Sequence, residues 1–118
     1  MPIVNQTNGQ TVCSHVRMAR SFWTRTRGLI GRSPLAAGEG LWIEPCQAVH
    51  MFFMRHVIDV IFLDSEGVVV GLRANLRPWR MTRLYSSARV ALELPAGAAA
   101  AAGVEVGHRL ASVEETAI

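Results

Sequence analysis

The chain has 118 residues, half of them hydrophobic, and a formal net charge of +3 from twelve basic and nine acidic side chains. A chain of this size and apolar content can bury one core without disulfides or metal, so we expect a single domain over residues 1–118. Residues 1–10 lack a secretory signal and no apolar stretch is long enough to span a bilayer, which favours a cytoplasmic protein with no membrane partner.

The first elements predicted along the chain are a hairpin and a helix. Residues 4–13 hold two short β-prone pieces on either side of Asn8-Gly9, a dipeptide that favours a tight hairpin turn. Ser14 can then cap an amphipathic helix that ends near residues 28–31. Apolar side chains recur along it at three- and four-residue steps: Ala19, Phe22, Trp23, Thr26, Leu29 and Ile30.

Short strands dominate the rest of the chain. Composition and turn residues predict them at residues 41–44, 58–64, 68–72, 89–94 and 108–113. A turn ending at Gly67 joins two of them into a second hairpin, and residues 95–103 form an alanine helix that Gly103 stops. Residues 75–85, with Pro78, form a connection of a length that is often functional.

Together these elements predict a mainly β (α+β) fold. Strands joined by hairpin-length turns favour an antiparallel, barrel- or sandwich-like sheet over a parallel βαβ arrangement. One amphipathic N-terminal helix and one short C-terminal helix complete the predicted fold.

The basic residues are all arginine, and most lie in two segments that contain no acidic residue. Residues 1–35 contain Arg17, Arg20, Arg25, Arg27 and Arg32, and residues 73–92 contain Arg73, Arg77, Arg80, Arg83 and Arg89. The favoured interpretation is a solvated surface that pairs with the intervening acidic segments. The alternative is a single patch for phosphates or an acidic partner, including nucleic acid with Trp79 available for stacking.

The chemically richest stretch runs from Cys46 to Asp64. Cys46 and His50 could form an activated thiolate pair, because a neighbouring imidazolium lowers a thiol pKa. A free cysteine more often behaves as a small buried hydrophobe, and we favour that interpretation for Cys46 and an unpaired state for Cys13. Paired zinc-ligand spacings are absent, so we expect no metal and no cofactor.

Two carboxylates interrupt apolar strands and need partners. Asp59 shares a predicted strand face with Ile61 and Leu63, and Arg55 or His50 is its nearest candidate partner in sequence. Glu93 is isolated in the same way within its own strand and could meet the same partners. The apolar residues Phe53 and Met54 could floor a ligand pocket, although an ordinary core plug is the favoured interpretation.

Several ordered blocks of the sequence resemble the DUF192 family of small bacterial and archaeal proteins. They are residues 27–32 (RGLIGR), 40–41 (GL), 50–55 (HMFFMR), 58–64 (IDVIFLD), 67–69 (GVV) and 92–97 (LELPAG). The resemblance covers roughly residues 12–113 and implies a mainly β domain with a helix near its start. It implies no activity. Many members of that family look exported or lipid-anchored, and because this sequence shows no such leader, we expect it to belong to a cytoplasmic branch.

Two hypotheses about function follow. The leading one is a non-enzymatic module that binds a small ligand, a peptide or a partner protein through residues 46–59 and 73–89. Its predicted ligand-binding residues are His50, Phe53, Met54, Arg55, Asp59 and Glu93. The alternative is an enzyme in which His50 acts as acid or base, Asp59 or Glu93 orients it, and Cys46 is a candidate nucleophile.

Overall fold

The computed structural model describes residues 1–19, 35–51 and 55–113, and its elements form two sheets. The smaller sheet has the strand order β2-β1-β8, built from β1 (Ile3–Asn5), β2 (Thr11–Cys13) and β8 (Leu110–Ser112). Both neighbours of β1 are antiparallel to it. The hairpin predicted around Asn8-Gly9 is therefore confirmed, and Gly9 adopts the positive φ of 77° that such a turn needs.

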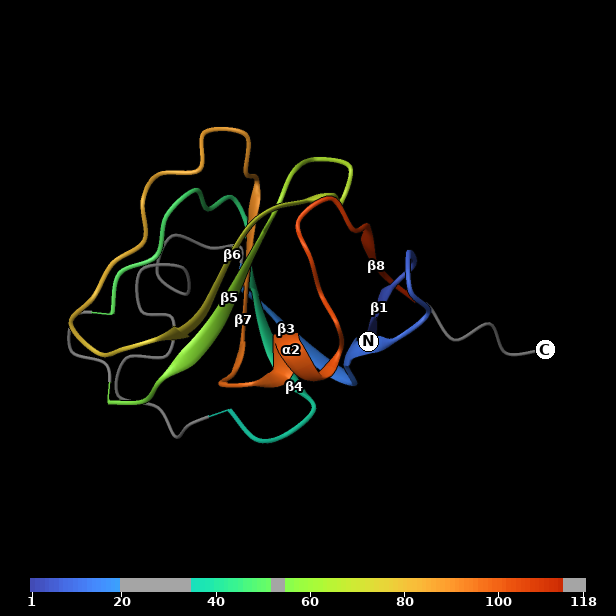
Figure 1. Ribbon diagram of the computed structural model, residues 1–118, viewed down its shortest axis with the longest axis horizontal. Helices are drawn as coiled ribbons and strands as arrows, with labels where there is room; N and C mark the ends of the chain where they lie inside the picture. The colour runs from blue at the N-terminus through green and yellow to red at the C-terminus, as the bar shows by residue number, and fades with distance from the viewer. Residues whose placement is uncertain (20–34, 52–54, 114–118) are drawn as a thin grey trace.

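The larger sheet has five strands in the order β3-β4-β7-β5-β6. They are β3 (His15–Ala19), β4 (Glu39–Ile43), β5 (Ile58–Leu63), β6 (Val69–Leu76) and β7 (Val90–Pro95). All neighbouring pairs are antiparallel except β3 and β4, which run parallel. Figure 1 shows this sheet crossing the centre of the molecule, with the smaller sheet to its right.

The five-stranded sheet has an apolar layer on each face, because β5 is buried along its whole length and β7 along all but its last residue. One face, which we name the connection layer, includes Leu41, Ile43, Ile58, Val60, Phe62, Leu76, Tyr85 and Ala91. The other face, which we name the helix layer, includes Ile3, Val12, Ile61, Leu63, Leu92, Leu94, Ala99 and Leu110. Alternate residues of one strand thus serve different layers, as the two-residue period of a strand requires.

The short helix α2 (Ala98–Ala101) packs on the helix layer, against β2, β5 and β7. It lies within residues 95–103, where the alanine helix was predicted, but is shorter, since Pro95 ends strand β7. Gly103 follows the helix with a φ of 63°, a left-handed conformation suited to a helix stop. None of the helices described in the structure is long and apolar enough to cross a membrane.

The mainly β prediction is confirmed, and one helix is corrected in part. Residues 15–19, which were expected to open the N-terminal helix after Ser14, form strand β3 and pair with β4 from His15↔Glu39 to Ala19↔Ile43. The remainder of that predicted helix lies outside the described residues. Pairing with a strand more than twenty positions away gives hydrogen-bond partners to the backbone groups on one side of β3, and a local apolar periodicity cannot reveal such a partner.

Candidate functional site

The two segments that the sequence singled out lie side by side. Residues 47–51 run antiparallel to residues 79–85, and backbone hydrogen bonds join Trp79 N–H to Met51 O (2.8 Å) and Met51 N–H to Arg80 O (2.7 Å). Thr82 N–H donates to Val49 O (2.8 Å), and the Thr82 hydroxyl accepts from Val49 N–H (3.0 Å). Figure 1 shows these two stretches, green and amber, together at the left of the molecule.

Tyr85 fixes the same connection to the sheet. Its ring stacks on Phe62 with centroids 4.3 Å apart and an interplanar angle of 23°, and the Arg83 guanidinium lies 4.1 Å from its centroid. The Tyr85 N–H donates to Gln47 O (2.8 Å), which ties it to the neighbouring segment as well. The ring also lies over Gly71, where a Cβ atom would sit only 2.2 Å from Tyr85 Cε1.

A Gly71→Ala variant is therefore expected to lower the free energy of unfolding by about 1–3 kcal/mol, because the new methyl group displaces the Tyr85 ring from Phe62. Urea denaturation measures this loss. In a Tyr85→Ala background the same glycine substitution should cost little, since nothing is left to displace. Equal losses in the two backgrounds would show that contact between residue 71 and the Tyr85 ring does not cause the loss of stability.

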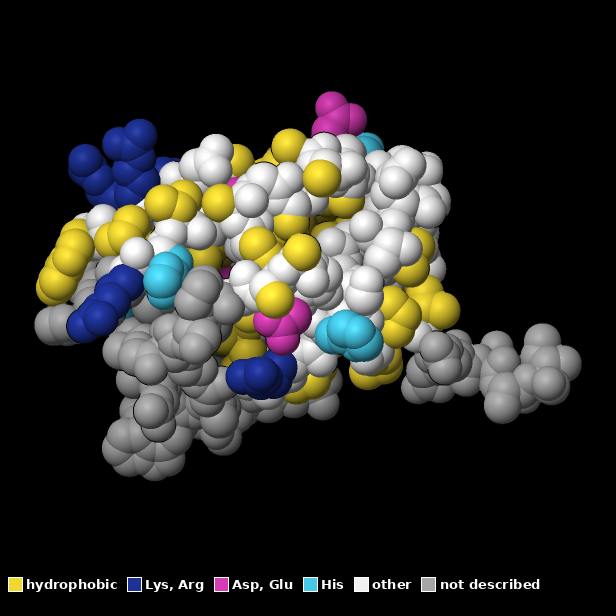
Figure 2. Space-filling view, turned by 90° about the horizontal axis from the view of Figure 1, so that it is seen from below, with side chains coloured by type: hydrophobic (Ala, Val, Ile, Leu, Met, Phe, Trp, Pro, Cys, Tyr) yellow, Lys and Arg dark blue, Asp and Glu magenta, His cyan; other side chains and the backbone are white. Residues whose placement is uncertain are grey.

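The connection displays a row of exposed side chains, which we name the arginine-apolar strip: Arg77, Trp79, Arg80, Met81, Arg83 and Leu84. Its apolar members are 60% (Trp79), 60% (Met81) and 61% (Leu84) exposed. Only eight large hydrophobic side chains are exposed in the described part of the chain, so three within six positions form a local cluster. Figure 2 shows dark-blue and yellow side chains close together at this end of the molecule.

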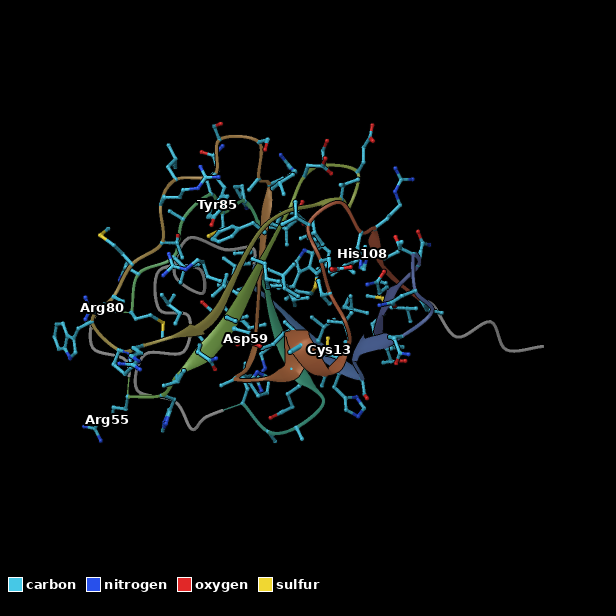
Figure 3. The ribbon with its side chains drawn as sticks, in the orientation of Figure 1. Cys13, Arg55, Asp59, Arg80, Tyr85 and His108 are labelled. Carbon is cyan, nitrogen blue, oxygen red and sulfur yellow. The ribbon has the colours of Figure 1, made fainter. Side chains whose placement is uncertain are left out.

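The arginines of this region differ in their interaction partners. Arg89 pairs with Glu44 through a 3.1 Å contact between Nε and Oε2, and Arg83 lies on the Tyr85 ring. No carboxylate of the described residues lies within ion-pair distance of Arg77 or Arg80. Figure 3 shows Arg80 and Arg55 at the same outer end of the molecule. The strip thus presents positive charge that no described carboxylate neutralises.

Asp59 is fully buried on β5 and hydrogen-bonded to the backbone. Its Oδ1 accepts from Asn75 N–H (2.9 Å), and its Oδ2 accepts from the N–H groups of Gly97 and Ala99, both at 3.0 Å. Two of these donors belong to the first turn of α2, so Asp59 caps that helix from a neighbouring strand. Figure 3 shows Asp59 beside α2, well inside the molecule. The geometry gives Asp59 a structural role.

Glu93 is buried on β7 under different conditions. Its side chain is 5% exposed, and within the described part of the chain its Oε2 has no hydrogen-bond partner. Leu41 and Val60 flank it across the sheet, so it faces the connection layer. Burial away from water raises the pKa of the Glu93 carboxyl from 4.5 to about 7.

The structure separates the two carboxylates that the sequence suggested might share partners. Asp59 lies opposite Leu94 in the β5–β7 register, whereas Val60 lies opposite Glu93. Side chains directly opposite each other share a face, so Asp59 faces the helix layer and Glu93 faces the connection layer. They cannot converge on one cavity, because the backbone of the sheet lies between them.

Two other predicted site residues, His50 and Arg55, lie at the end of the molecule that carries the strip. His50 and Arg55 are exposed, and His50 forms an isolated antiparallel bridge with Met81. Phe53 and Met54 lie outside the described residues. The structure therefore brings His50 next to the strip and leaves Asp59 apart from it.

Cys46 is half-buried and its thiol donates to Ala48 O at 3.1 Å. A hollow of about 320 Å³ opens beside it, lined by residues 45–47 and by Ala88 and Arg89 at the end of the 73–89 connection. The other thiol, Cys13, is unpaired and buried, and its burial raises its pKa. Across the described ranges, no three histidine, cysteine or carboxylate side chains are placed to hold a metal ion.

Met81, Leu84 and Tyr85 were not among the predicted site residues, although all three help to form or anchor the strip. Their sequence signal is weak, because apolar residues in a connection usually pack inward. The alternation of apolar residues with arginines over residues 77–84, in a segment without acids, is the pattern that could have indicated an exposed surface.

Comparison with known proteins agrees with the fold. The DUF192 family model, described as "Uncharacterized ACR, COG1430", matches residues 3–112. A UPF0127 protein of Pyrococcus furiosus is 38% identical over 113 residues, which cover 92% of this chain and 95% of that protein. A UPF0127 protein of Thermococcus sibiricus is 34% identical over 113 residues, covering 92% and 72%. The crystal structure of a protein of unknown function from Novosphingobium aromaticivorans has a TM-score of 0.82 at 23% identity, over 95% of this chain and 84% of that one.

Proposed function

The chain belongs to the DUF192 (UPF0127) family, and we propose that it is a non-enzymatic module that binds a small ligand, a peptide or a partner protein through residues 46–59 and 73–89. Its expected cytoplasmic location is part of the same proposal. The observation that carries the proposal is the exposed arginine-apolar strip on a connection that is already held in place.

Preorganisation is what distinguishes this surface from an ordinary loop. Backbone hydrogen bonds to residues 47–51 and the stacking of Tyr85 on Phe62 hold the connection in one conformation. A partner that docks on a held surface loses less conformational entropy than one that must order a mobile segment. Trp, Met and Arg are also the side chains enriched at protein interfaces, which supports a binding role.

The enzyme alternative finds less support in the geometry. A mechanism based on His50 needs a second group to orient the imidazole. Asp59 faces the helix layer, and both of its oxygens accept hydrogen bonds from backbone N–H groups. Glu93, which faces the connection layer, is then the remaining candidate for that orienting group. The Cys46 thiol, the candidate nucleophile, donates to a carbonyl. We therefore retain the binding module as the proposed function.

Photo-crosslinking in the native host tests this proposal. Benzoylphenylalanine placed at Leu84, which is 61% exposed, is expected to give a discrete adduct when cells are irradiated, identified by mass spectrometry. The matched control is the same residue at Val106, which is 63% exposed and lies outside both segments. Absence of an adduct at position 84, or the same adducts from both positions, would contradict the proposed binding surface.

A further inference from the structure

The arginine-apolar strip carries a chemical pattern that restricts its partner further. From this pattern we infer that the strip binds a short segment of a partner protein in which acidic and apolar side chains alternate. The inference rests on the proposed function and names the class of its partner. Charge, apolar exposure and backbone conformation each support it.

Charge complementarity requires an acidic partner. Residues 73–92 contain no acidic residue, and neither Arg77 nor Arg80 has a carboxylate of the described residues within ion-pair distance. Opposite charges on a partner would steer its approach and fix its register, while a basic partner would be repelled. Arg side chains can also hold carboxylates in a planar two-bond geometry.

Apolar contact is the second requirement. Trp79, Met81 and Leu84 are each at least 60% exposed, so a partner that covers them removes substantial apolar surface from water. They alternate with the arginines along the chain, which favours a partner whose apolar and acidic side chains also alternate. Contacts of this mixed kind, with Trp and Arg as anchors, carry much of the binding energy at protein interfaces.

The backbone at Trp79 adds a third observation. Its φ is 66°, a left-handed conformation that bulky residues seldom adopt and that costs roughly 1–2 kcal/mol. The hydrogen bond from Trp79 N–H to Met51 O holds this conformation while the indole remains exposed. The fold thus keeps an unfavourable backbone conformation at an exposed tryptophan, and such conformations cluster at functional positions.

Two other anionic partners fit the strip less well. Single-stranded nucleic acid would use the arginines and could stack a base on Trp79, but it offers nothing to cover Met81 and Leu84. An anionic membrane favours apolar side chains that are segregated from the charged ones by depth. Here the two kinds of side chain are interleaved, so the peptide is the favoured partner.

Fluorescence anisotropy with a short labelled peptide of alternating glutamate and leucine tests the inference on the intact chain. Binding is expected for this peptide and not for its lysine-for-glutamate counterpart. Trp79→Ala should weaken it about tenfold or more. A double Arg77→Glu and Arg80→Glu variant should abolish it, and added salt should weaken it. Matched controls, Val106→Ala and Arg109→Glu, change exposed residues outside the strip and should bind as the parent does.

Three results would overturn the inference. The glutamate peptide does not bind, or the strip variants and the control variants change its binding equally. The third result is that the chain prefers oligothymidylate or phosphatidylglycerol vesicles to the peptide. The crosslinking experiment at Leu84 tests the binding module independently of these outcomes. An adduct there without peptide binding would reject the acidic partner and keep the binding module. Absence of both would reject both proposals.

Discussion

Replacing Asp59 with alanine is expected to lower the free energy of unfolding by at least about 4 kcal/mol, the largest effect of any single substitution considered. The variant removes the acceptor of three backbone N–H groups, those of Asn75, Gly97 and Ala99. The Asp59 side chain is fully buried, so water cannot readily replace the lost acceptor. Urea or thermal denaturation measures the change, with loss of α2 visible by hydrogen exchange at Ala99.

Two further variants separate the hydrogen bonds from other effects. Asp59→Asn keeps the shape and one acceptor oxygen, so we expect about half of the alanine loss. Asp64 is the matched control, because its Oδ1 also accepts from two backbone N–H groups, those of Glu66 and Val68, but in a half-buried turn. Asp64→Ala should cost about 1 kcal/mol, since water can reach the donors. Similar losses at the two positions would reject a special structural role for Asp59.

Glu93 is expected to make the protein less stable as the pH rises. Its pKa is about 7 in the folded state against 4.5 for an unperturbed glutamate, so between these values the folded chain binds more protons than the unfolded chain. Stability from this group is complete below about pH 4.5 and is lost as the pH rises through about 7. In Glu93→Gln that dependence disappears. The free energy of unfolding of the variant relative to the parent should therefore rise by about 2–3 kcal/mol between about pH 5 and about pH 8.

Urea denaturation at several pH values measures how the difference in free energy of unfolding between the variant and the parent changes with pH. A constant cost of burying the glutamine amide shifts this difference equally at every pH and so does not affect the result. Glu66→Gln supplies the matched control, because the Glu66 side chain is 75% exposed and its contact with Arg109 is a 3.7 Å surface ion pair. A parallel pH dependence in the parent and in Glu93→Gln would show that the Glu93 carboxyl titrates normally.

Local patterns in the sequence predicted many of the elements correctly. The Asn8-Gly9 hairpin, the hairpin that turns at residues 65–67 and the alanine helix before Gly103 each depend on neighbouring residues. The strand at residues 15–19 was missed and a helix was expected there instead, because β3 exists through its parallel pairing with β4. That pairing joins residues that are far apart in the sequence, so short-range periodicity cannot predict it.

In the candidate site too, local sequence predicts some features, while others depend on pairing between distant strands. Alternation within β5 correctly placed Asp59 with Ile61 and Leu63, but the relation of Asp59 to Glu93 depends on the register between β5 and β7. A shift of one residue in that register would have put the two carboxylates on one face. Likewise, the juxtaposition of residues 47–51 with residues 79–85 could not be read from either segment alone.

The division of the interior into a connection layer and a helix layer has a consequence for how such a chain can change during evolution. Neighbours in sequence such as Ile61 and Phe62 belong to different layers, separated by the backbone of the sheet. Substitutions on opposite sides of that backbone that are more than about 10 Å apart and share no partner should have nearly additive effects on stability. The connection layer and the helix layer, which contains the Asp59 contacts to α2, can therefore accept substitutions largely independently of each other.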